Sequence, residues 1–226
     1  MVSPSDFRKA VKTVFKPLSL EHGFVFYKPL MLLRLYQDTL HIIYFDKGSA
    51  GFACDVAIQP LCLPDNIVSL SFGARLSRFQ ASLPERWDYG DSSAELLGNL
   101  SEVLQLVRKN ALPWFNDAGS PQGFISFIES GAANNPKYAL RCPPHLKQLY
   151  LAFCYGYVGR LRDSVGAFDR VLQSLEGNPF SAQWKALASE MRTSIANDPE
   201  AVEDKIKSFV RQTKEALGLD KLFERA

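Results

Sequence analysis

The stretch from residue 24 to residue 58 constrains the fold more than any other part of the chain. It contains four short runs of apolar and aromatic residues separated by turn residues: 24–28, 31–37, 40–47 and 52–58. Asp38-Thr39 separates the second run from the third, and Gly48 to Gly51 separate the third from the fourth. Connections this short join antiparallel strands, because parallel strands need a longer crossover. The sequence therefore predicts an antiparallel sheet, with a further strand near Ile67–Phe72.

The predicted register depends on where the two turns close. A turn at Asp38-Thr39 pairs Leu35 with Ile42. A loop of five residues after Asp46 then pairs Ile43 with Asp55. Because side chains alternate between the faces of a strand, this register puts an apolar set on one face. The set is Leu33, Leu35, Leu40, Ile42, Tyr44, Cys54, Val56 and Ile58. We expect that face to carry the helices.

The second predicted face is too apolar for a solvated sheet face. It holds Leu32, Arg34, Tyr36, His41, Ile43, Phe45, Ala53, Asp55 and Ala57. We expect a cover, which is the helical C-terminal part, a second copy of the chain, or a ligand. Its polar members Arg34, Tyr36, His41 and Asp55 are the candidate binding residues. They indicate either an anion or general-base site, or a charge-paired docking surface, which we favour because buried charges are usually paired.

Helical signals bracket the predicted sheet. Ser3 or Ser5 caps a first helix that Gly23 ends. Ser92 opens a capping box for a second helix, which Pro113 is expected to end. A shorter helix near residues 121–130 follows.

The segment GAANNP, residues 131–136, is the best candidate for a boundary between two regions. After it, helices are predicted up to about Val158 and then at Leu161–Leu175, Phe180–Asn197 and Glu200–Leu217. The predicted fold class is α+β. An antiparallel sheet of four or five strands with helices on one face fills residues 1–130, and an all-helical region fills residues 136–226.

Composition excludes several classes of function. The formal net charge is +2, which is too small to draw nucleic acid or an anionic membrane. The four cysteines, at positions 54, 62, 142 and 154, lack the spacing of a zinc site, and we expect reduced thiols in a cytoplasmic protein. His22 and His145 have no metal-ligand partner at helical spacing. We therefore predict no metal, no cofactor and no catalytic motif.

Residues 4–130 resemble a known bacterial family. The residues that carry the resemblance are Gly23-Phe24 after the first helix, the strand ending Ile58-Gln59-Pro60, Arg75-Leu76, and Pro113-Trp114-Phe115. In this order they are similar to the bacterial domain-of-unknown-function family 4304. The resemblance implies no activity and no catalytic residues.

Residues 145–175 resemble a single tetratricopeptide-like helical hairpin. Small and aromatic residues recur at the positions such a repeat uses for close helix packing: Ala152, Tyr155, Gly159, Ala167 and Phe168. A free-standing array needs about three repeats, so the resemblance implies helix packing of repeat type and no peptide-binding array.

These observations favour a non-enzymatic interaction or accessory protein, which binds another protein or a second copy of itself. The alternative is a small ligand-binding or hydrolase-like enzyme that uses Arg34, His41 and Asp55. The two hypotheses differ in whether those three side chains converge on an open cavity.

Overall fold

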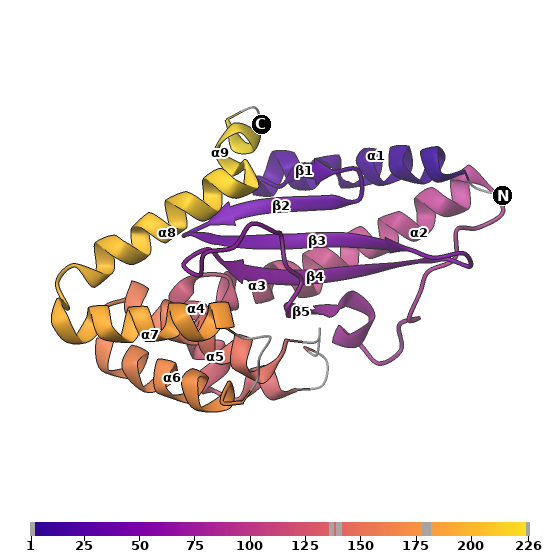
Figure 1. Cartoon of the computed structure of the whole chain (residues 1–226). Helices are drawn as coiled ribbons and strands as arrows, with labels where there is room; N and C mark the ends of the chain where they lie inside the picture. The colour runs from indigo at the N-terminus through magenta and orange to yellow at the C-terminus, as the bar shows by residue number, and fades with distance from the viewer. Residues whose placement is uncertain (1–2, 136–137, 139–141, 178–181, 225–226) are drawn as a thin grey trace.

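Five strands form one antiparallel sheet in a computed structural model that describes residues 3–135, 138, 142–177 and 182–224 (Figure 1). The spatial order equals the chain order: β1 (Val25–Lys28), β2 (Met31–Tyr36), β3 (Thr39–Lys47), β4 (Phe52–Pro60) and β5 (Phe72–Arg75). Strands β2, β3 and β4 each pair with the strand before them, as the short turns predict, and β5 pairs with β4 after the longer segment 61–71. The predicted α+β class, an antiparallel sheet followed by a helical region, is confirmed.

Helices precede and follow this sheet. They are α1 (Pro4–His22), α2 (Ser93–Leu106), α3 (Leu112–Ala118), α4 (Pro121–Glu129), α5 (Pro144–Tyr157), α6 (Leu161–Ser174), α7 (Ala182–Asn197), α8 (Val202–Leu217) and α9 (Leu219–Phe223). Pro136, Phe180 and Ser181, which fall in the predicted boundary and in the third predicted C-terminal helix, lie outside the described residues.

Local signals place the helix ends correctly. The Ser3 hydroxyl accepts from the Asp6 N–H, and Gly23 ends α1 in the left-handed conformation at φ 70°. The Ser92 hydroxyl caps α2 in the same way. The prediction that Pro113 ends this helix is wrong. A π-helical turn, Val107–Ala111, carries the chain into α3, and its shifted hydrogen bonds accommodate the missing N–H of Pro113.

The predicted turn at Asp38-Thr39 is one residue too late. Gln37 and Asp38 form the turn, with φ of 44° and 57°, and Thr39 is the first residue of β3. Moving a two-residue turn by one position shifts the register by two, so Leu35 pairs with Leu40 and not with Ile42. An even shift keeps every side chain on its predicted face of β2 and β3.

The loop between β3 and β4 overturns the predicted faces of β4. It has four residues, not five, because Lys47 pairs with Phe52. Ile43 therefore lies opposite Val56, and Asp55 lies opposite Tyr44. A slip of one residue reverses the whole strand, so Asp55 leaves the face that holds His41.

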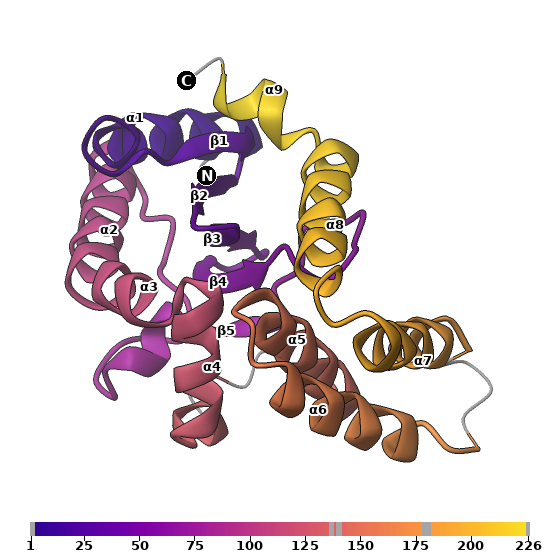
Figure 2. The same ribbon diagram turned by 90° about the vertical axis from the view of Figure 1, so that its left-hand side faces the viewer.

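Helices α1, α2 and α3 cover the sheet face that holds His41, Ile43 and Phe45, here called the α1 face (Figure 2). Phe7 and Phe15 of α1 pack on Phe45 with ring centroids 6.4 and 4.8 Å apart. The helices were expected on the opposite face, which holds Leu33, Leu40 and Ile42, so that expectation is wrong. With Val56 and Ile58 turned onto it, the α1 face is the more apolar one, and burial of apolar area decides which face carries the helices.

The opposite face, here called the α8 face, holds Ile42, Tyr44 and Asp55. The segment after β4 folds back over part of it, where Gln59 accepts from the Ser69 N–H at 2.8 Å and donates to the Ile67 carbonyl at 3.1 Å. Residues 67–71 are not a strand, contrary to prediction, because Gln59 holds their backbone through its side chain. Helix α8 flanks the same side of the sheet (Figure 2).

The C-terminal helices pack against the β5 edge of the sheet. Phe72 of β5 contacts Phe124 of α4 and Tyr150 of α5, with ring centroids 4.8 and 5.0 Å apart. Helices α5 and α6 form an antiparallel hairpin closed at Gly159, in which Ser164 donates to the Ala152 carbonyl at 2.8 Å. The buried apolar residues form one cluster that runs through both parts of the chain.

Candidate functional site

Arg34 and His41 meet on the α1 face as directly bonded neighbours. They are paired across β2 and β3, and Arg34 donates to His41 Nδ1 from Nε at 3.0 Å and from Nη2 at 2.8 Å. Tyr36 lies beside them, with its ring centroid 5.8 Å from that of His41, and its side chain is exposed. Three of the four predicted binding residues are therefore together.

The imidazole of His41 is enclosed. Because Nδ1 accepts from Arg34, the proton resides on Nε2, which donates to the Gly119 carbonyl at 2.7 Å. The Phe115 ring stacks on the imidazole with centroids 4.8 Å apart and planes 4° from parallel. Gly119 is required at its position, since a methyl group there would overlap the His41 ring. The side chain is fully buried and both ring nitrogens are engaged.

These surroundings keep His41 neutral. Burial, helped by the positive charge of Arg34, lowers the pKa of His41 to about 4, although the bond to Gly119 opposes the shift. Arg34 also lies over the Phe24 ring, 5.1 Å from its centroid. A neutral imidazole with both nitrogens bonded cannot take a proton from a substrate. The geometry is that of a link between the sheet and the turn from α3 to α4.

Asp55 lies on the α8 face, in a separate charge network. Arg75 of β5 donates to Asp55 Oδ1 at 3.1 Å and approaches Asp46 at 3.6 Å and Glu85 at 3.4 Å. Arg86 contacts the same oxygen of Asp46, Oδ2. Burial raises the pKa of Asp55, against the opposing effect of Arg75. The expectation that Asp55 shares a face with Arg34 and His41 is wrong, because the register of β4 turns Asp55 to the opposite face.

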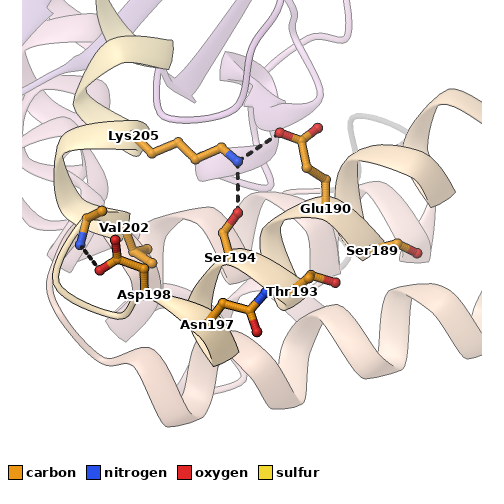
Figure 3. A pocket seen from close by; sticks show the side chains of 9 residues that line it. Ser189, Glu190, Thr193, Ser194, Asn197, Asp198, Val202 and Lys205 are labelled. Atoms are coloured by element: carbon orange, nitrogen blue, oxygen red, sulfur yellow. Dashed lines mark hydrogen bonds and ion pairs between the residues drawn. The ribbon is translucent and has the colours of Figure 1, made fainter.

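A groove that sequence analysis did not find lies between α7 and α8, with a cavity volume of about 520 Å³ (Figure 3). Its lining is Ser189, Glu190, Thr193, Ser194, Asn197, Asp198, Ala201, Val202 and Lys205. Lys205 of α8 reaches across it and bonds Glu190 and Ser194 of α7, each at 2.8 Å. Short hydroxyl and amide side chains repeat along the exposed side of α7. This repeat is the feature of the sequence that could have indicated a polar surface on this helix.

Comparisons with protein-family models, with curated proteins and with solved structures found no match. The resemblances to domain-of-unknown-function family 4304 and to a tetratricopeptide-like hairpin therefore stay predictions.

Few side chains in the part of the chain that the structure describes are placed to bind a metal ion or to react as a thiolate. No group of three or more His, Cys, Asp or Glu side chains there is placed to hold a metal ion. The four cysteines are unbridged, and Cys62 and Cys154 lie with sulfurs 3.6 Å apart in the core. Burial raises the pKa of Cys142 to about 12, so its thiolate is scarce.

Among the described residues, no helix is long and apolar enough to cross a membrane.

Proposed function

We propose that this chain is a non-enzymatic interaction protein that binds a segment of another protein in the groove between α7 and α8. The observation that carries the proposal is the groove itself. Two consecutive helices diverge and leave about 520 Å³ between them, lined by small hydrogen-bonding side chains. Grooves between helices are common binding sites for partner segments.

The chemistry of the groove suits a partner segment with polar side chains. Ser189, Thr193 and Asn197 are exposed along one side of α7 and offer both donors and acceptors. Lys205 and Glu190 neutralise each other within the groove, and the carboxylate of Asp198 accepts from the Ala201 N–H.

The enzyme hypothesis has less support. It needs Arg34, His41 and Asp55 around one cavity, and the register places Asp55 on the opposite face. Arg34 is bonded to His41, and Arg75 is bonded to Asp55, so each candidate base already has a partner within the chain. The cluster is better explained as internal bonding that stabilises the fold.

Site-specific crosslinking tests the proposal. A photoreactive residue at Thr193 should crosslink one partner in the source cells, and the same residue at exposed Arg162 of α6 should not. Ala201→Trp fills the groove from its rim and should abolish the adduct, with the circular dichroism spectrum unchanged. Identical adducts from Thr193 and Arg162, or an adduct that survives Ala201→Trp, would refute binding in the groove.

A further inference from the structure

A second hollow lies between α1 and the edge strand β1, at a distance from the α7–α8 groove. Its cavity volume is about 400 Å³, and it is lined by Arg8, Lys9, Lys12, Phe26, Tyr27, Lys28 and Pro29. In Figures 1 and 2, α1 and β1 lie on the other side of the molecule from α7. Two partly buried aromatic side chains form its apolar wall, and four cations surround it.

None of the four cations forms a close ion pair with a described residue, although Lys9 lies near enough to Asp6 to help lower the pKa of that carboxyl. Five arginines and three lysines elsewhere contact a carboxylate: Arg75, Arg86, Arg108, Arg160, Arg192, Lys205, Lys207 and Lys214. Arg8, Lys9, Lys12 and Lys28 belong to no ion pair in the described structure. Four positive charges gathered in one place exceed the +2 of the whole chain.

The arrangement on α1 is unfavourable without an anion. Arg8 and Lys12 are one helical turn apart, where like charges repel. A bound anionic group would offset this repulsion. A lysine on an edge strand, such as Lys28, is a common protection against pairing with other chains. That reason does not apply to the three cations on α1.

The neighbouring strand offers a backbone template. β1 is at the edge of the sheet, and outside its ladder with β2 its backbone has no hydrogen-bond partner in the described part of the chain. Helix α9 touches β1, but Figure 1 shows it near the C-terminal end of α1, whereas the hollow is lined from the first half of α1. An extended segment can therefore pair with β1 beside the cations.

We propose that this hollow binds an extended acidic segment of a partner protein, which adds to the sheet as a strand next to β1. Carboxylates of the segment face Arg8, Lys9, Lys12 and Lys28, and one apolar side chain enters the hollow against Phe26 and Tyr27. This site is independent of the α7–α8 groove, so either can fail without the other. Together they would let the chain hold two partners at once.

Fluorescence anisotropy with labelled decapeptides tests the proposal on the full chain. The first probe alternates glutamate with valine and carries one phenylalanine. The second has glutamine in place of each glutamate, and the third is the acidic peptide with alternate backbone amides N-methylated. We expect the acidic peptide to bind, and the glutamine peptide to bind at least roughly tenfold more weakly, with affinity falling as salt rises. N-methylation should abolish binding, because it removes the strand hydrogen bonds.

Matched variants locate the site. Lys9→Gln/Lys12→Gln should weaken binding of the acidic peptide roughly tenfold. Arg162→Gln/Lys185→Gln, which removes two cations from α6 and α7, should leave binding unchanged. The proposal is overturned if the glutamate and glutamine peptides bind alike, or if the N-methylated peptide binds as well as its parent. Binding of phosphatidylserine vesicles with the same dependence on Lys9 and Lys12, or displacement by inorganic phosphate, would also overturn it in favour of a general anion surface.

Discussion

Lys214 of α8 forms an ion pair with Asp38 in the turn between β2 and β3, with 2.6 Å between Nζ and Oδ1. Tyr157 at the end of α5 donates to the other oxygen of the same carboxylate at 2.7 Å. Burial pushes the pKa of Asp38 upward, but the hydrogen bonds from Lys214 and Tyr157 outweigh it and leave the pKa below its ordinary value. One turn residue therefore ties the first hairpin to two C-terminal helices.

Removing the cation should destabilise this connection. Lys214→Met is expected to lower the free energy of unfolding by about 1 kcal/mol, since the pair is partly buried and Asp38 keeps the bond to Tyr157. Urea unfolding at neutral pH measures this. Lys221→Met, at an exposed position of α9 where the lysine forms no ion pair with a described residue, is the control and should change stability by less than about 0.5 kcal/mol. Equal effects of the two changes would contradict the role of the pair.

His41 should make stability depend on pH. Its pKa is about 4 in the folded protein and 6.5 as the ordinary value, so the unfolded chain binds more protons between these values. The contribution of neutral His41 to the free energy of unfolding is complete above about pH 6.5 and is lost as pH falls toward 4. This difference in pKa between the folded and unfolded chain corresponds to about 3 kcal/mol at most. Urea unfolding from pH 7 to pH 4 should show the loss in the wild type, while His41→Gln should lack that part of it. Parallel curves for the two proteins would show that another group is responsible.

Asp55 is buried and Arg75 is partly buried, and the two should behave as a coupled ion pair. Arg75→Met leaves the buried carboxylate without its main partner and should cost about 3 kcal/mol of stability. Asp55→Asn should cost less, because an amide carries no charge to desolvate. The double change Asp55→Leu/Arg75→Met should recover most of the loss. Chemical denaturation of the three variants checks this order, and a double variant less stable than Arg75→Met would contradict it.

The cysteines should react only after unfolding. Cys54, Cys62 and Cys154 are buried, and the raised pKa of Cys142 keeps its thiol protonated. We expect a thiol reagent to label the folded protein slowly and to find four thiols in the unreduced, denatured protein. Two or fewer thiols after denaturation would show a disulfide and would contradict the prediction of reduced cysteines.

The sequence by itself determined the elements and their antiparallel order. Ser3, Gly23 and Ser92 act on backbone groups within a few residues, so the chain ends its helices where these residues stand. The short turns between β1 and β4 likewise favour an antiparallel meander, whereas the position of β5 after the segment 61–71 was not predicted correctly. The prediction that Pro113 ends the helix was wrong, because the chain continues through a π-helical turn whose hydrogen-bond pattern accommodates the missing N–H of Pro113.

Only the tertiary structure decided the register and therefore the site. Gln37-Asp38 and Asp38-Thr39 are both acceptable turns locally, and the ion pair with Lys214, far along the chain, accompanies the first. A loop of four rather than five residues moved Asp55 to the α8 face. Side chains on a strand alternate, so one residue of slip separates groups that the sequence placed together. The groove between α7 and α8 and the hollow beside β1 arise from contacts between elements, which no local pattern specifies.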